Sequence, residues 1–181
     1  MQELDSAVIL ITGAMAAGKS TVAQLLAERL PRSVHLRGDT FRRMIVSGRE
    51  EFLPQPSAEA TAQLRLRHEA TATIADLYAR SGWTVVAQDI VLGDHLTAFL
   101  TSVTTRPLYL VVLSPPPETL TSREASRPKT GYGGPWTPTT LDATLRRETP
   151  RLGLWLDTSE QTPEETVDAI LAGLTTARIT D

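Results

Sequence analysis

Short apolar runs alternate along the chain with longer stretches in which apolar residues recur at helical spacing. The runs are rich in β-branched residues, as is typical of buried parallel strands. Val22, Leu25, Leu26 and Leu30 illustrate the helical spacing, because they share one face. The pattern predicts strands at 8–12, 33–37, 84–88, 108–113 and 154–156. It predicts helices at 21–30, 39–47, 57–81, 94–102, 114–125 and 140–149, and a last helix that opens at 162.

Turn and cap residues separate these segments. Pro31 ends the first helix, and Gly82 ends the long third one. The sequence T-P-E-E at 162–165 is a capping box with proline at the first helical position. Segments 50–56 and 127–138 are expected to be loops, the second one rich in glycine and proline. This alternation predicts an α/β fold with a doubly wound parallel sheet, built as a single domain over residues 1–181.

Composition limits the location and the chemistry. The chain has 181 residues, of which 41% are hydrophobic, and this suffices for one domain with a full core. Its formal charge of −3 gives no general attraction to nucleic acid or to anionic membranes. The absence of cysteine excludes disulfides, thiolate zinc sites and a cysteine nucleophile. No apolar stretch approaches the ~18 residues that cross a bilayer, and no positive segment precedes the first apolar run, so a cytoplasmic protein is expected.

The segment G-A-M-A-A-G-K-S at 13–20 matches the phosphate-binding loop pattern G-x-x-x-x-G-K-[ST], and it lies between a predicted strand and a predicted helix. Small residues let such a loop curl around phosphate oxygens, toward which its N–H groups and the helix end point. Lys19 is expected to reach the β- and γ-phosphates, and the Ser20 hydroxyl to bind Mg²⁺. The nucleotide-binding residues are expected to be Gly13, Ala14, Met15, Ala16, Ala17, Gly18, Lys19, Ser20 and Thr21, with Arg123 in addition.

Two aspartates follow predicted strands, at the edge where open α/β sheets bind ligands. Asp39 is interpreted in two compatible ways, as the N-cap of the next helix or as the base that accepts a proton from an attacking hydroxyl. Asp89 ends an apolar strand and is expected to contact Mg²⁺ or the substrate; the alternative is a cap or turn residue before Gly93.

Arg123 and Arg127 lie one helical turn apart, just before the glycine-rich segment. Lids of this kind carry arginines onto a transferring phosphate, and the alternative is a solvated basic face. A lid is therefore expected at about 124–138, and an acceptor-binding region at about 39–80. The acceptor pocket is expected to draw on Asp39, Phe41, Arg42, Met44, Ile45, Phe52, Asp89, Ile90, Val91 and Leu92.

The long third helix has Arg65, Arg67 and His68, which are expected to form a solvated face or else to contact an anionic acceptor. Structural roles are expected for His35, His68 and His95.

The chain resembles phosphate-loop small-molecule kinases of the chloramphenicol phosphotransferase type. The similarity runs through most of its length, in GAMAAGKS, GDTF, VVAQDIVLG, SREASR and WLDTSEQTPEETVDAI. It implies a three-layer α/β/α P-loop NTPase fold of the nucleotide-kinase type, with a five-stranded parallel sheet in the order 2-3-1-4-5. It also implies ATP with Mg²⁺, Asp39 as the base, and Arg123 and Arg127 as lid arginines beside Lys19. Lys129 stands near where the family has another arginine, and segment 42–56 has no close match.

These observations predict an ATP-dependent kinase that transfers the γ-phosphate to a hydroxyl of a small molecule. The acceptor can be an antibiotic, a nucleoside or a sugar, and the role can be resistance or metabolism. The sequence also leaves open whether ATP or GTP is the preferred donor, and which oligomeric state the protein has. The alternatives are a regulatory nucleotide-binding module without phosphotransfer, or a kinase for a nucleotide sugar or a nucleic-acid end. A GTPase is disfavoured, because a chain without asparagine cannot contain N-K-x-D.

Overall fold

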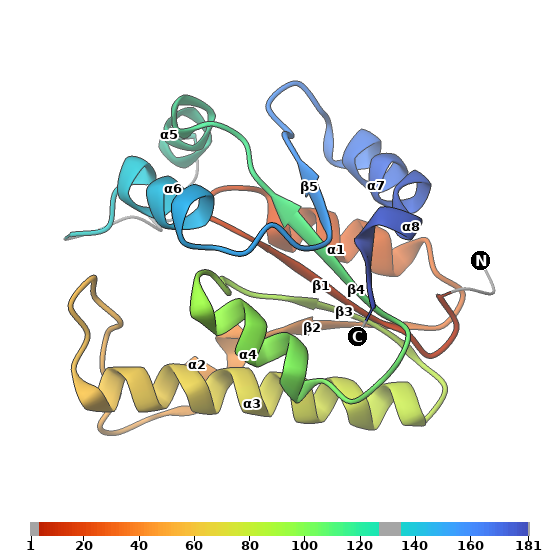
Figure 1. Ribbon diagram of the computed structural model, residues 1–181, viewed down its shortest axis with the longest axis horizontal. Helices are drawn as coiled ribbons and strands as arrows, with labels where there is room; N and C mark the ends of the chain where they lie inside the picture. The colour runs from red at the N-terminus through yellow and green to blue at the C-terminus, as the bar shows by residue number, and fades with distance from the viewer. Residues whose placement is uncertain (1–3, 127–134, 181) are drawn as a thin grey trace.

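A parallel sheet forms the middle layer of the molecule (Figure 1). The computed structural model describes residues 4–126 and 135–180. Five parallel strands run in the order β2-β3-β1-β4-β5, as predicted. They are β1 (Val8–Gly13), β2 (Ser33–Arg37), β3 (Thr84–Gln88), β4 (Leu108–Leu113) and β5 (Leu154–Leu156). A sixth strand, β6 (Arg178–Ile179), pairs antiparallel with β4 and was not predicted, because two residues carry no periodic pattern.

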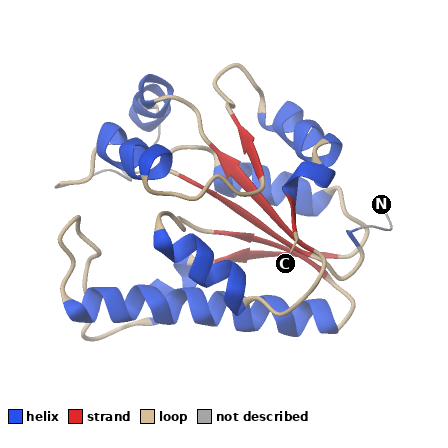
Figure 2. Cartoon of the chain, viewed as in Figure 1, coloured by secondary structure: helices blue, strands red, loops and turns tan. Residues whose placement is uncertain are grey.

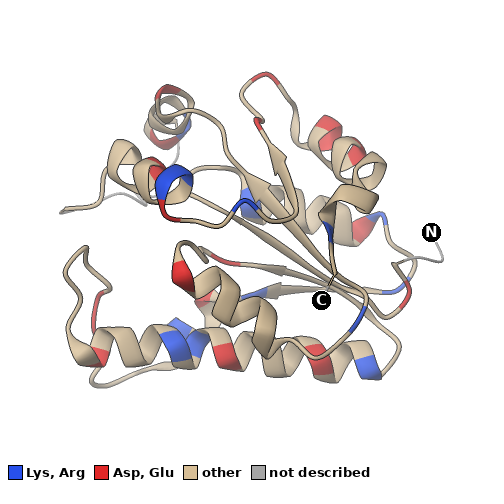
Figure 3. Cartoon of the chain, viewed as in Figure 1, with Lys and Arg blue, Asp and Glu red and all other residues tan. Residues whose placement is uncertain are grey.

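The central strands are buried on both faces. Every residue of β1 (VILITG), β3 (TVVAQ) and β4 (LYLVVL) is buried, whereas β2 at the sheet edge is only half-buried. Helices cover both faces of the sheet, which is the arrangement that continuous apolar strands require (Figure 2). Charged residues lie on helices, loops and strand ends (Figure 3). The fold is therefore the predicted α/β sandwich, with the strands as its core.

The helices pack in groups. On one face α1 (Lys19–Glu28) contacts α7 (Pro163–Ala172), and on the other α3 (Ala58–Arg80) contacts α4 (Asp94–Ser102) and α2 (Asp39–Met44). Helix α5 (Pro117–Ala125) packs against α6 (Pro138–Arg147), and the short α8 (Leu174–Ala177) contacts β4 and β5. Among the described residues, no helix has both the length and the hydrophobicity needed to span a membrane.

Several helix ends differ from prediction for local reasons. Helix α2 stops at Met44 instead of 47, because Ile45 is extended. Helix α5 starts at Pro117 instead of 114, since each proline at 115–117 favours an extended conformation in the residue before it. Helix α6 starts earlier than predicted, at Pro138, where the side chain of Thr137 accepts from the Thr140 amide. The capping box before α7 is confirmed, with both reciprocal hydrogen bonds present.

Candidate functional site

The turn from β1 to α1 has a backbone that few sequences can adopt. Gly13 has φ 145°, and a Cβ atom there would lie 2.3 Å from the carbonyl oxygen of Leu113 on β4. Ala16 and Gly18 also have positive φ, 63° and 94°. For alanine, that conformation costs about 1–2 kcal/mol, and such strain is concentrated at functional sites. The small residues of this loop are thus required by its shape.

The start of α1 fits an anion. Its N-cap is Gly18, which has no side chain to accept from the first amides, and the first turn contains no acidic residue. A helix start without such acceptors leaves N–H groups and a positive dipole end for a bound anion. Lys19 is buried, and its Nζ donates to the carbonyl oxygens of Gly13 (3.0 Å) and Ala14 (2.7 Å). The ammonium group is therefore held over the loop, while Ser20 and Thr21 are exposed.

Two cavities meet at this loop. The larger has a volume of about 940 Å³ and the smaller about 430 Å³, and Ala16, Lys19 and Ser20 line both. Ala17, Gly18, Thr21 and Arg123 line the smaller one. The larger one contains Met15 and many of the residues expected at the acceptor site: Asp39, Arg42, Ile45, Phe52, Asp89, Ile90 and Leu92.

Three expected pocket residues do not line the larger cavity. Phe41 and Met44 are absent from its lining, and the Met44 residue is 68% exposed. Val91 is fully buried, and its amide donates to the Thr12 hydroxyl in the core. Side chains alternate in direction after β3, so Ile90 and Leu92 line the larger cavity while Val91 packs in the core.

Arg123 lies along the smaller cavity. Its Nη1 donates to the Thr158 hydroxyl (3.2 Å) and approaches the Ala17 carbonyl oxygen (3.5 Å), while its Nη2 donates to the Thr158 carbonyl oxygen. It thereby joins α5 to the loop after β5, and does not line the cavity that contains Asp39. Arg127 and most of the expected lid at 124–138 lie outside the described residues.

Asp39 is the first residue of α2, and the N-cap is Gly38, which makes no side-chain cap. The interpretation of Asp39 as the N-cap is therefore wrong. Its carboxylate instead accepts from Nε of Arg43 (2.6 Å), and Nη1 of Arg42 lies 3.9 Å away. The Asp39 side chain is 37% exposed and faces the larger cavity, so solvent and ligands reach it.

Asp89 is engaged differently. Its carboxylate forms a two-pronged ion pair with Nε (2.6 Å) and Nη2 of Arg67 on α3, and accepts from the Ile90 amide (2.7 Å). The two side chains are 2% and 15% exposed. Gly38 packs against this carboxylate, and a Cβ atom there would lie 2.0 Å from Asp89 Oδ2. Arg67 is therefore largely buried in the wall of the cavity, with its side chain 15% exposed. The solvated helix face that the sequence favoured for Arg67 is wrong.

Aromatic rings form one wall of the larger cavity. His95 contacts Phe52 and His68 edge-on, with ring centroids 6.0 and 5.8 Å apart, and His68 contacts Phe99 at 6.0 Å. The indole Nε1 of Trp136 donates to the Phe52 carbonyl oxygen across 2.7 Å. These contacts join segments far apart in the sequence, and no local pattern indicates them. Within the described part of the chain, no cluster of three or more acidic or histidine side chains is placed to hold a metal.

A family model described as an AAA domain, a P-loop domain, matches residues 8–175. The chain belongs to this family. No curated protein matches it significantly. A sugar kinase from Janibacter sp. has a similar structure (TM-score 0.69, 19% identity, 94% of this chain and 95% of that one). The Mycobacterium tuberculosis APS kinase in complex with AMPPNP and APS is also similar (TM-score 0.68, 19% identity, 93% of this chain and 97% of that one). So is the Deinococcus radiodurans tunicamycin resistance protein (TM-score 0.65, 16% identity, 97% of this chain and 99% of that one). These likenesses show that the AAA domain has the fold of P-loop kinases.

The buried His68 makes stability depend on pH. Burial lowers its pKa from 6.5 to about 4, while nearby Asp89 raises it and Arg67 and His95 lower it. From pH 6.5 down to about 4, the unfolded chain binds a proton at this residue and the folded one does not. The free energy of unfolding should fall there by up to about 1.4 kcal/mol per pH unit, with no contribution above pH 6.5.

Urea unfolding across this range measures the slope, and His68→Phe should reduce it. Part of the slope should remain in that variant, because burial also lowers the pKa of His35 to about 4. An unchanged slope in His68→Phe would contradict the assignment.

The ion pair of Asp89 gives a second prediction. Asp89→Asn leaves Arg67 buried without a partner, so the free energy of unfolding should fall by about 3 kcal/mol. The exposed pair Arg29–Asp168 is a matched control, and Asp168→Asn should cost less than about 1 kcal/mol. The metal role that the sequence predicts for Asp89 is tested in the same variant by titrating AMPPNP at several Mg²⁺ concentrations. A raised Mg²⁺ requirement in Asp89→Asn supports that role, and an unchanged requirement favours the anchor.

Proposed function

We propose that the protein is a kinase that transfers the γ-phosphate of ATP to a hydroxyl of a small molecule. One observation carries the proposal: Lys19 and Ser20 line both cavities, and Asp39 lines only the larger one. A donor in the smaller cavity would therefore end at the loop, where an acceptor in the larger cavity meets it. A regulatory module needs only one ligand site, and the second cavity with its carboxylate favours the enzyme.

The donor site follows from the loop. The amides at the start of α1, together with Lys19, suit the β- and γ-phosphates, and Arg123 in the smaller cavity suits the rest of the nucleotide. The AMPPNP in the APS kinase structure supports a nucleotide here. Ser20 is the proposed Mg²⁺ ligand, and the metal would neutralise charge on the transferring phosphate. We propose Asp89 as a metal ligand only in a state where its pair with Arg67 opens. Arg127 is proposed as a second lid arginine on the phosphate.

Asp39 is proposed as the base. Asp39 lines the larger cavity, and a hydroxyl bound there would donate its proton to the carboxylate as its oxygen attacks the γ-phosphorus. The bond from that phosphorus to the β–γ bridging oxygen breaks, and ADP leaves. The pair with Arg43 fixes the orientation of the carboxylate. The AAA domain family and the kinase fold support phosphotransfer in general. A compartment that supplies ATP, the cytoplasm, is the proposed location.

The acceptor is proposed to have both apolar and polar surface. Ile45, Leu64, Ile90, Leu92 and Trp136 line the cavity beside its charged residues. A sugar kinase, a gluconokinase, a shikimate kinase and a tunicamycin resistance protein share the fold, so sugars, nucleosides and antibiotics are all proposed acceptor classes. The antibiotic class also agrees with the resemblance to chloramphenicol phosphotransferases.

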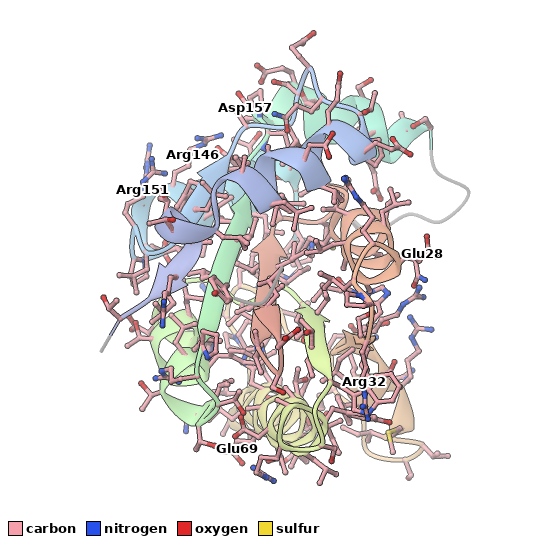
Figure 4. All side chains as sticks on the ribbon, turned by 90° about the vertical axis from the view of Figure 1, so that its right-hand side faces the viewer. Glu28, Arg32, Glu69, Arg146, Arg151 and Asp157 are labelled. Carbon is pink, nitrogen blue, oxygen red and sulfur yellow. The ribbon has the colours of Figure 1, made fainter. Side chains whose placement is uncertain are left out.

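Lys19→Ala tests the donor site. Removing the ammonium group should weaken ATP binding or turnover strongly, because the loop amides alone must then hold the phosphates. Calorimetric titration with AMPPNP and Mg²⁺ measures the binding, and thermal melting checks the fold. Arg32→Ala is the control, since Arg32 lies on the outer surface (Figure 4). Unchanged binding and turnover in Lys19→Ala would show that the loop does not bind nucleotide.

Asp39→Asn tests the base. The variant keeps the size of the side chain and loses only an exposed ion pair, so stability should change by less than about 1 kcal/mol. Phosphotransfer should slow by about 10²–10⁴-fold, because the attacking hydroxyl loses its proton acceptor. Glu69→Gln removes an outward-facing carboxylate of α3 as the control (Figure 4). The rate is measured by the mass of the product in a screen of antibiotics, nucleosides and sugars, and full activity in Asp39→Asn would remove this residue from the mechanism.

A further inference from the structure

The larger cavity contains an arginine that lacks a carboxylate partner. Arg42 pairs with Glu51, Arg43 with Asp39, and Arg67 with Asp89. Arg37, the exposed last residue of β2, also lines the cavity, and its side chain forms no hydrogen bond or ion pair with any residue that the structure describes. An arginine side chain cannot lose its charge in a protein, so it attracts an anion from solution.

A glutamine amide of the neighbouring strand lies beside this arginine. Gln88, the last residue of β3, pairs with Arg37 in the parallel register, which directs the two side chains to the same face of the sheet. Gln88 lines the cavity and is only 6% exposed, and its side chain has no hydrogen-bond partner in the described ranges 4–126 and 135–180. Among the described residues, the buried side-chain atoms without a partner are Nε2 of His35 and Nε2 of His68, so the amide atoms of Gln88 reach the open space of the cavity. A ligand in the cavity can therefore bond this amide in place of solvent.

The remaining acidic charges of the cavity are already compensated. Asp39, Glu51 and Asp89 belong to the three ion pairs. Glu50 accepts from the hydroxyl of Ser57, the N-cap of α3, so it lies at the positive end of a helix of 23 residues. None of these carboxylates is bonded to Arg37 in the described structure, and its positive charge stays available.

We propose that Arg37 and Gln88 bind an oxyanion of the acceptor, so that the acceptor is a hydroxylated acid. This rests on the proposed kinase function. The guanidinium supplies charge and two-pronged donors, and the Gln88 amide adds a donor that fits the next oxygen of a carboxylate, sulfate or phosphate. Arg37 lines the cavity of Asp39 and not the smaller one, so the oxyanion belongs to the acceptor and not to the nucleotide. The acidic group would hold the molecule at one end while Asp39 meets its hydroxyl.

Sulfate, a simple oxyanion probe, tests the site whatever the identity of the acceptor. The protein is first saturated with AMPPNP and Mg²⁺, so that the loop is filled, and sulfate binding is then followed by NMR or calorimetry. We expect saturable sulfate binding that leaves AMPPNP bound. Arg37→Ala should weaken it at least about tenfold, since charge-assisted bonds are lost. Gln88→Glu should weaken it similarly, because the new carboxylate pairs with Arg37. Arg80→Ala, which removes an exposed arginine at the end of α3, should have no effect.

Three results would overturn the oxyanion site: no saturable sulfate binding by the wild type, displacement of AMPPNP by sulfate, or equal sulfate affinity in wild type and Arg37→Ala. Thermal melting of each variant separates loss of the site from loss of the fold. Failure of the wild type to bind AMPPNP would instead contradict the proposed function itself.

A substrate comparison is the second test. D-gluconate and D-glucitol, or glycerate and glycerol, differ only in a carboxylate that replaces a CH2OH group. We expect phosphorylation or competitive inhibition to favour the acid of each pair, and Arg37→Ala to abolish that preference while AMPPNP affinity is unchanged. A neutral compound that serves as well as its acid, with no effect of Arg37→Ala, would contradict the proposal.

Discussion

The parallel pairing of β1 with β3, and of β3 with β2, determines where most of the candidate site residues of this protein lie. Parallel strands all end at one edge of a sheet, so the segments after β1, β2 and β3 must meet there. The loop at 13–20 follows β1, Asp39 follows β2, and Gln88 and Asp89 end β3. Met15 and Asp89 are 74 positions apart along the chain, and both reach the larger cavity because their strands are neighbours.

Salt bridges then fix the wall of that cavity. Arg42, Arg43 and Arg67 each bond a carboxylate, which holds long side chains in one orientation before a ligand arrives. Of these pairs only the one with Asp89 is deeply buried, so its loss should be felt by the whole fold, whereas the two others are partly solvated and contribute mainly to orientation. The cavity thus has one buried ion pair, Arg67–Asp89, and two partly solvated ion pairs.

The sequence predicted what depends on short-range patterns. The five parallel strands, the loop at 13–20 and the capping box before α7 follow from runs of neighbouring residues, and the structure contains them. The start of α5 was missed because successive prolines compete with the helical pattern, and β6 because it is too short. The partners of Asp89 and Arg123 could not be predicted, since Arg67 and Thr158 lie on other elements and are chosen by packing. The cavity role of Arg37 and Gln88 was missed for the same reason, as strand register brings them together.

Gly38 links the residues that can be accepted at three positions of the sequence. Its backbone lies where a methyl group would overlap the carboxylate of Asp89, and that carboxylate in turn needs Arg67. Positions 38, 67 and 89 therefore cannot drift independently. A larger residue at position 38 would require the carboxylate of Asp89 to move, and that movement would break its pair with Arg67. Among relatives, the residues at the three positions should therefore change together, because each one shapes the wall of the larger cavity.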